Sequence, residues 1–369
     1  MTDYKTQSIA LVASLVLLSS CASSGGTYVD AASTEAVDVT TTKNVILMVS
    51  DGIGFNGWLA ADYYQGRAGQ QSYQVVRPDG TVPLVYGMTH DALNLIDASG
   101  EIISDRDLLP NAVGAVEQGY DPLTRWDRFE GAFPNDFAPE NAPYTAYTDS
   151  AAAGTALMTG RKTSNGRINM DWSGKERFRT IAQIAMDLDR SAGTVASVMA
   201  SHATPASVIA HNVSRNNYAE IFNEMVSSEL DVIMGAGHPY YDASGNEVEP
   251  EGDEAFQFVG GKETLAALTS DTGLNGFAFI DSKSDFEVLA SGAEVPERVV
   301  GIAQSNSTLQ ARREGLPSSD TPSGMAFNVD VPDLATMSVG ALNVLSQDSD
   351  GFFLMIEGGA VDWMGHANN

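Results

Sequence analysis

The sequence predicts an α/β protein whose core is a parallel sheet, and three observations carry this prediction. Four continuous apolar runs have the composition of strands that are buried on both faces: residues 44–50, 194–199, 231–237 and 351–356. Segments with helical composition lie between several of these runs. The first and last runs lead into polar turns that contain glycine, and open α/β sheets bind ligands at such strand ends.

Composition and charge narrow the function classes. The chain has 369 residues, 43% of them hydrophobic, which is enough for one large domain or two ordinary ones. Its formal net charge is −28 at pH 7, and no basic stripe is present to meet the phosphates of a nucleic acid. We therefore expect no nucleic-acid-specific binding. An anionic substrate would need a local positive centre, supplied by a metal ion or an arginine.

The start of the chain has the features of an export signal. Residues 1–20 are predicted to be a signal peptide, because the apolar run at 9–18 is too short for a permanent membrane span. The run ends in a pattern that resembles a bacterial lipobox, which predicts a lipid anchor on Cys21. A cleaved signal with an incidental cysteine is the alternative. Residues 21–43, rich in Ser, Thr, Ala and Gly, are predicted to be a flexible tether. We expect an exported protein, periplasmic, at the outer membrane or on the cell surface, that touches membrane only through this anchor.

The folded domain is expected to begin at residue 44. The strand at 44–50 leads into Asp51 and Gly52, which is typical of a ligand site, although an aspartate that merely turns the chain fits equally well. Residues 55–66 are predicted to be helical. Residues 67–143, with many Gly, Pro and Asp, are interpreted as an insertion, and its His90 as a structural or surface histidine.

Ser150 stands where a polar turn meets a run of helix-forming residues. Its hydroxyl is therefore predicted to lie near a helix N-terminus, where free N–H groups and the helix dipole favour an anion. The alternative is that Asp149 and Ser150 only cap the helix. Residues 180–188 are predicted to form an amphipathic helix.

The strand at 194–199 runs into His202 and Thr204, which we expect at the same sheet edge as Asp51. A helix is predicted over 206–213, with His211 packing on it. Arg215 follows this helix and either turns inward or remains a solvated surface residue.

The last part of the chain carries a third group of polar residues. Residues 238–330, including His238, have weak periodicity and are interpreted as an insertion without chemistry. A helix over 332–346 precedes the strand at 351–356, which leads into Glu357 and then Asp362 and His366. If that stretch is helical, the last two lie on one face, and their spacing suits zinc, although a surface pair is the alternative.

Taken together, residues 44–66, 144–237 and 332–369 resemble the alkaline phosphatase family. The resemblance is carried by three phrases in the family's order: T-D-S-A-A-A-G-T-A, A-T-P-A-S-V-I-A-H-N-V-S-R and G-F-F-L-M-I-E-G-G-A-V-D-W-M-G-H-A-N-N. It implies a three-layer fold in which helices cover both faces of a mostly parallel central sheet. It also implies hydrolysis of small phosphate monoesters through a phosphoserine intermediate, at a site with two Zn²⁺ ions and one Mg²⁺ ion.

The resemblance assigns roles residue by residue. Ser150 resembles the nucleophile and a metal ligand, Arg215 the guanidinium that binds two phosphate oxygens, and Asp149 the group that orients it. Asp51 resembles the carboxylate that bridges the second zinc and the magnesium. The other implied metal ligands are Thr204 and Glu357 for magnesium, and Asp362 and His366 for the first zinc.

Some positions depart from the family pattern. His202 stands where many relatives have an aspartate near the third metal, and Trp363 stands where others have a lysine or histidine near phosphate.

The family takes its remaining zinc ligands from segments beyond His366, so we expect a partial sequence with an incomplete sheet, inactive by itself. A non-catalytic phosphate- or metal-binding lipoprotein, a related phosphodiesterase and a sulfatase stay open as alternatives, as does a homodimer.

Overall fold

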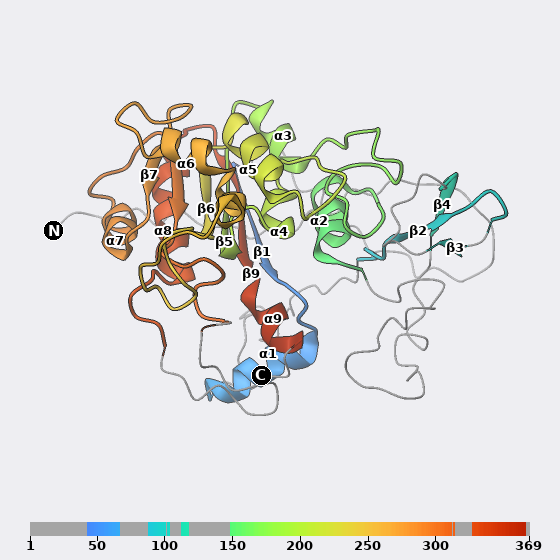
Figure 1. Ribbon diagram of the computed structural model, residues 1–369, viewed down its shortest axis with the longest axis horizontal. Coiled ribbons are helices and arrows are strands. Elements are labelled where there is room, and N and C mark those ends of the chain that lie inside the picture. The colour runs from blue at the N-terminus through green and yellow to red at the C-terminus, as the bar shows by residue number, and fades with distance from the viewer. Residues whose placement is uncertain are drawn as a thin grey trace, which may run out of the picture.

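The computed structural model describes residues 43–66, 88–100, 102–103, 112–117, 148–311, 313 and 327–366. Its core is a six-stranded sheet with the strand order β1-β9-β5-β6-β8-β7, in which all neighbouring strands are parallel (Figure 1). In chain order the strands are β1 (Asn44–Ser50), β5 (Ser191–Met199), β6 (Val232–Ala236), β7 (Ala278–Ile280), β8 (Val299–Ile302) and β9 (Phe352–Gly358). The four predicted strands are present, and the α/β class is confirmed.

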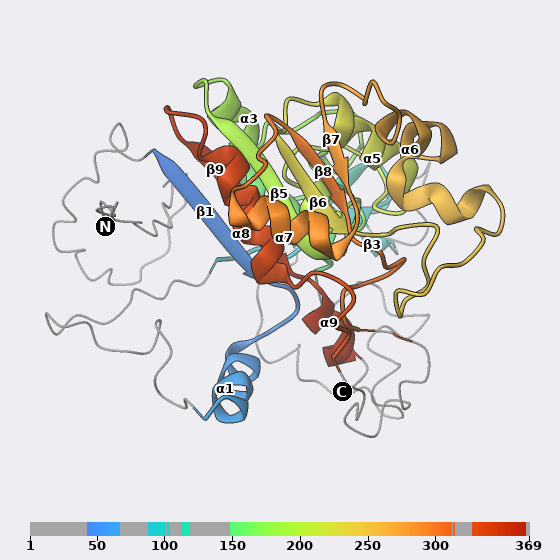
Figure 2. The same ribbon diagram turned by 90° about the vertical axis from the view of Figure 1, so that its left-hand side faces the viewer.

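Helices cover both faces of this sheet, so the predicted three-layer arrangement is confirmed. On one face a single core is formed with α2 (Ser150–Thr159), α3 (Ile181–Met186), α4 (Ala203–Ala206), α5 (Tyr218–Ser227), the 3₁₀ helix η3 (Asp253–Val259) and α6 (Lys262–Leu268). On the other face α7 (Lys283–Ser291) and α8 (Leu334–Leu345) form a second core (Figure 2). Alternate residues of the strands point into the two cores, as the apolar runs require.

Two short helices follow the strands at one edge of the sheet. The first, α1 (Phe55–Tyr64), comes after β1, and the second, α9 (Ala360–His366), comes after β9. Both lie beyond the carboxyl ends of these strands (Figures 1 and 2). Among the described helices, none is long and apolar enough to cross a membrane.

A second, smaller sheet belongs to the segment predicted as an insertion at 67–143. It is antiparallel, has the order β3-β2-β4, and lies apart from the central sheet (Figure 1). Its strands are β2 (Leu93–Ile96), β3 (Ile102–Ile103) and β4 (Gly114–Glu117). The rest of that segment lies outside the described residues, as do the predicted signal peptide, Cys21 and the tether up to residue 42.

Two expectations differ from the observed fold. Residues 238–330 are not simply peripheral, because β7 and β8 of this segment extend the central sheet. These strands have three and four residues, which is too short to give a clear pattern in the sequence. The helix expected over 206–213 is also wrong, since α4 spans Ala203–Ala206 and the chain after it turns and then pairs with another segment.

Candidate active site

Three neighbouring strands bring the predicted residues to one edge of the sheet. Asp51 directly follows β1, and Glu357 lies near the end of β9, opposite Val49 of β1. His202 and Thr204 follow β5, the neighbour of β9 on its other side. Because the three strands are parallel, their carboxyl ends coincide, as predicted for a ligand site in an open α/β sheet.

A cavity of about 530 Å³ lies at this edge. It is lined by eight of the predicted side chains: Asp51, Asp149, Ser150, His202, Arg215, Asp362, Trp363 and His366. Two other cavities, of about 550 and 500 Å³, have a similar volume but are lined by none of these residues. The candidate site is therefore identified by the side chains that line the cavity and not by the cavity volume.

Ser150 is the first residue of α2, as its sequence context predicts. Asp149 caps this helix by accepting a hydrogen bond of 2.9 Å from the N–H of Ala152. The Ser150 hydroxyl donates a hydrogen bond of 2.8 Å to Oδ2 of Asp51. The serine thus lies at the positive end of a ten-residue helix, and its Oγ is directed at the carboxylate of Asp51, which follows β1.

Arg215 is turned inward and is not a solvated surface residue. Its guanidinium donates a hydrogen bond of 3.0 Å to Oδ2 of Asp149, and only 20% of its side chain is exposed. The carboxylate of Asp149 therefore joins the helix that carries Ser150 to the loop that carries Arg215. This contact places one positive charge in the same cavity as the serine.

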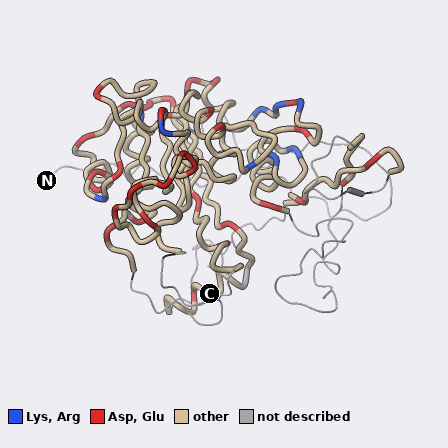
Figure 3. The backbone as a smooth tube through the Cα atoms, in the orientation of Figure 1, with Lys and Arg blue, Asp and Glu red and all other residues tan. Residues whose placement is uncertain are grey.

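The charge of Arg215 matters because Asp and Glu residues are spread over much of the described chain, whereas most Lys and Arg residues lie in the loops around α2 and α3 (Figure 3). An anion that enters the cavity therefore meets mostly negative surroundings. Arg215 and the N-terminus of α2 are the positive features that line this cavity.

Glu357 is fully buried between β1 and β5. Burial raises the pKa of its carboxyl to about 8, and the negative charge of Asp51 adds to the effect. Its two oxygens, and the hydroxyl of Thr204, make no hydrogen bond of ordinary geometry to another described residue. The Thr204 hydroxyl is nevertheless close enough to lower the pKa of Glu357 in part. Thr204 and the charge of Arg215 therefore compensate the burial of this carboxylate only in part.

Asp51 shares these surroundings. Burial raises the pKa of its carboxyl, and the negative charge of Asp362 raises it further, while Ser150 and Arg215 oppose the shift. Asp51 and Asp362 also both act on Glu357. The negative charges of Asp51, Asp362 and Glu357 therefore act on one another, while only Asp51 and Asp362 line the cavity.

Asp362 and His366 lie one turn apart on α9, which confirms that this stretch is helical. Nε2 of His366 is 3.4 Å from Oδ1 of Asp362. The His366 side chain is 77% exposed, whereas Asp362 is mostly covered. Gly52 allows Asp362 to approach, because a Cβ atom at Gly52 would lie 2.2 Å from its Oδ1.

The described residues contain no group of three or more His, Cys, Asp or Glu side chains assembled closely enough to hold a metal ion. The donor chemistry nevertheless fits cations. Oxygen donors around the buried Glu357 suit Mg²⁺, and a carboxylate with an imidazole suits Zn²⁺. The mutual repulsion of Asp51, Asp362 and Glu357 is what a bound cation would relieve.

Aromatic side chains form one wall of the cavity. The ring of His202 stacks on that of Tyr218 at 6.3 Å and meets Trp363 edge-on at 5.6 Å. Tyr218 is not among the site residues that the sequence predicts, and His90 is predicted to be structural or at the surface, yet both line the cavity. The position of Tyr218, three residues after Arg215 and at the start of α5, was the available signal.

The fold and the site define an α/β protein with a serine at a helix N-terminus, an arginine and converging carboxylates at one sheet edge. A family model described as alkaline phosphatase matches residues 112–369. The chain belongs to the alkaline phosphatase family.

Curated relatives agree with this assignment. Alkaline phosphatases 4 and 3 of Bacillus subtilis are each 31% identical to this chain, over 63% and 62% of it and 43% and 42% of their own lengths. The alkaline phosphatase of Escherichia coli is 25% identical over 89% of this chain and 62% of its own length. The chain spans about half the length of the curated relatives it matches.

Solved structures show the same fold. The alkaline phosphatase from the Antarctic bacterium TAB5 has a TM-score of 0.50 at 24% identity, covering 89% of this chain and 68% of its own. That of Thermus thermophilus has a TM-score of 0.50 at 19% identity, covering 87% of this chain and 50% of its own.

Proposed function

We propose that the protein hydrolyses phosphate monoesters and that Ser150 is the nucleophile, which forms a phosphoserine intermediate. The observation that carries the proposal is the hydroxyl of Ser150, which lies at the N-terminus of α2, donates to Asp51 at 2.8 Å and shares a cavity with Arg215. Membership of the alkaline phosphatase family supports phosphomonoester hydrolysis in general.

The reaction has two displacements at phosphorus. In the first, Oγ of Ser150 forms a bond to phosphorus while the bond from phosphorus to the ester oxygen breaks and the alcohol leaves. In the second, water attacks the phosphoserine, so that inorganic phosphate is released and the hydroxyl is restored. Asp51 accepts the hydrogen bond of the Ser150 hydroxyl and would take up its proton as Oγ bonds to phosphorus, while the leaving ester oxygen gains a proton from solvent.

Arg215 and α2 supply the positive field for the phosphoryl group. The planar guanidinium offers two parallel N–H groups to two phosphoryl oxygens, which the point charge of a lysine does not. Asp149 fixes the guanidinium at 3.0 Å and limits the freedom that it would lose on binding.

The residues present fit the cations that the family resemblance implies. Asp51, Thr204 and Glu357 would hold Mg²⁺, while Asp362 and His366 would serve one Zn²⁺, and Ser150 and Asp51 the other. When bound, such ions lower the pKa of a coordinated hydroxyl or water and stabilise the oxygens that enter and leave. The identity of the three ions is part of the proposal.

The proposal also covers the substrate size, the cellular location and the oligomeric state of the protein. A cavity of about 530 Å³ suits small phosphate monoesters. The lipobox-like sequence before Cys21 supports an exported lipoprotein anchored at the membrane surface. A homodimer is compatible with the proposal, which does not depend on it.

The test is hydrolysis of p-nitrophenyl phosphate at alkaline pH, with zinc and magnesium added, by the full-length gene product. Wild type is expected to turn over and to stop when EDTA is added. Ser150→Ala is expected to lose turnover but to keep binding inorganic phosphate. Undiminished turnover in Ser150→Ala would refute the nucleophile. Phosphate binding by wild type without turnover would favour a non-catalytic binding protein, and preference for a phosphodiester or a sulfate ester would favour the related hydrolases.

A further inference from the structure

We propose that the turn formed by Asn165 and Gly166 is a positioning element for Arg215 and for the start of α2. The inference deepens the proposed function and rests on it. Neither residue is among those that line the cavity, so the turn would act through Asp149 and Arg215 and not by touching substrate. Four hydrogen bonds carry the argument.

Gly166 binds both partners of the ion pair through its main chain. Its N–H donates to Oδ2 of Asp149 at 2.9 Å, and its carbonyl oxygen accepts from the N–H of Arg215 at 2.7 Å. The same Oδ2 of Asp149 accepts the guanidinium of Arg215 at 3.0 Å. The three residues therefore form a closed ring of hydrogen bonds, in which moving one partner strains the other two.

Asn165 fixes the main chain beside the serine. Its Oδ1 accepts a hydrogen bond of 2.9 Å from the N–H of Asp149, the residue that immediately precedes Ser150. The carboxylate of Asp149 is already occupied by Ala152, Gly166 and Arg215. Asn165 thus adds an independent restraint on the backbone from which the Ser150 side chain projects.

The turn itself is anchored. Gly166 has φ of +81°, which a glycine adopts without strain. Directly after the turn, Ile168 and Asn212 form an antiparallel bridge through two hydrogen bonds, of 2.9 and 3.0 Å. The segment that carries Arg215 is therefore held on one side by this bridge and on the other by Gly166. Two segments distant in sequence, at 149–150 and 212–215, are kept in register by one turn.

The decisive experiment is a double-mutant cycle between Asn165→Ala and Arg215→Ala, read as kcat, KM and the dissociation constant of inorganic phosphate. If Asn165 acts by positioning, Asn165→Ala lowers kcat/KM and weakens phosphate binding about tenfold, since misplaced groups lose binding at the reacting centre. In the Arg215→Ala background the effect of Asn165→Ala on phosphate binding should shrink to less than threefold, because the guanidinium that Asp149 orients is absent, whereas the loss in kcat that acts through the Ser150 backbone should remain. Loss of phosphate affinity by the same factor in both backgrounds would overturn the proposal.

Two further variants serve as a control and as a second test. Asn216→Ala is the matched control, because Asn216 is exposed and adjoins Arg215, and its side chain accepts a long hydrogen bond of 3.4 Å from Tyr218 instead of contacting Asp149; it should leave kcat/KM and phosphate binding unchanged within twofold. Asn165→Gln keeps the amide but displaces its oxygen by one methylene, so it should weaken phosphate binding in the same direction even if the alanine variant folds poorly. Normal phosphate binding in a folded Asn165→Gln variant would contradict the proposal.

The phosphate measurement also separates this inference from the proposed function. If wild type binds phosphate but hydrolyses no ester, the proposed function fails while the positioning can still be read from the binding constants. If wild type is an active phosphatase and Asn165→Ala matches it in every constant, the positioning fails and the proposed function stands.

Discussion

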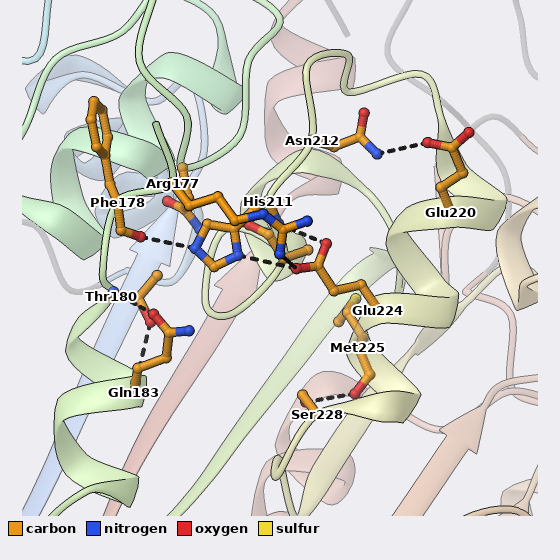
Figure 4. Close-up of polar contacts among 12 residues, drawn as sticks. Arg177, Phe178, Thr180, Gln183, His211, Asn212, Glu220, Glu224, Met225 and Ser228 are labelled. Carbon is orange, nitrogen blue, oxygen red and sulfur yellow. Dashed lines mark hydrogen bonds and ion pairs between the residues drawn. The ribbon is translucent and has the colours of Figure 1, made fainter. Parts of the chain in front are cut away.

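Glu224→Gln should destabilise the protein by about 2 kcal/mol at neutral pH, because Glu224 holds the buried His211 in the segment that leads to Arg215 (Figure 4). Nδ1 of His211 is 3.1 Å from Oε1 of Glu224, and Nε2 is 2.9 Å from the carbonyl oxygen of Phe178. Both partners are acceptors, so a ring nitrogen that carries a proton donates it to the partner that it faces.

The magnitude follows from three contacts. The main-chain N–H of His211 also donates to Glu224, at 3.0 Å, and Arg177 donates at 3.0 Å. A hydrogen bond to a charged group such as the carboxylate of Glu224 contributes about 1.5–3 kcal/mol, and the imidazole side chain is only 5% exposed. The Arg177 side chain is 64% exposed, so that pair contributes at most about 0.5 kcal/mol. Glutamine keeps one acceptor oxygen, so the free energy of unfolding should fall by about 2 kcal/mol in total.

The effect should depend on pH in a defined direction. Burial alone would raise the pKa of Glu224, but the hydrogen bonds and charge of His211 and the charge of Arg177 hold it below its usual value. Its contribution is therefore present above the unfolded pKa, about 4.5, and is lost as the pH falls through the lower folded value. The difference between wild type and variant should be constant above about pH 5.5 and shrink below about pH 4.5.

Urea unfolding of wild type, Glu224→Gln and Glu220→Gln measures this difference. Glu220 lies one turn earlier on α5 and, among the described residues, accepts from the neutral amides of Asn212 and Asn217, at 3.1 and 3.4 Å. The free energy of unfolding of Glu220→Gln should therefore fall by less than about 1 kcal/mol. Equal losses of stability in the two variants, or no loss in Glu224→Gln at pH 7, would refute the reasoning about the hydrogen bonds that the Glu224 carboxylate accepts from His211.

Two further substitutions test the site. Arg215→Lys should raise the inhibition constant of inorganic phosphate about tenfold, roughly 1.4 kcal/mol, because one point charge replaces a planar fork; an unchanged constant in inhibition assays would show that the fork does not contact phosphate. Gly52→Ala should displace Asp362, because the new Cβ would lie 2.2 Å from Oδ1 of Asp362 and Gly52 has a φ of +63°. The variant should therefore retain less zinc after dialysis, measured by atomic absorption, and should have a lower kcat. Full zinc content and activity in that variant would contradict the role assigned to the close approach.

The parts of the fold that could be predicted from the sequence are those set by local composition. β1 and β9 are long apolar runs, and the polar residues that follow them, such as Asp51 and Glu357, come to one edge because the strands are parallel. The N-terminal position of Ser150 follows equally from the helix formers behind it.

The parts that could not be predicted depend on partners distant in sequence. The helix expected over 206–213 is not formed, because the side-chain amide of Asn169 binds the carbonyl oxygens of Ser207 and Ala210, at 2.7 and 2.8 Å. Residue 212 is then drawn into the bridge with Ile168. These contacts span some forty residues, and tertiary interactions of this kind override local helix propensity.

The apolar stripe of α3 shows a second limit of local patterns. Ile181 and Ile184 are 40% and 45% exposed, whereas Ala182 is buried against the sheet. The small residue packs where space is short, and the larger ones of the amphipathic pattern lie at the surface. Periodicity predicted the helix but not which side it presents to the core.

The measurement that tests the central claim most directly is a search for phosphate bound covalently to Ser150. The full-length protein, with zinc and magnesium, would be incubated with ³²P-labelled phosphate or ester, quenched in acid and digested for peptide mapping. We predict label on the peptide that contains Ser150, and none in Ser150→Ala. Steady turnover by wild type with no label on that peptide, or equal label in Ser150→Ala, would contradict the account.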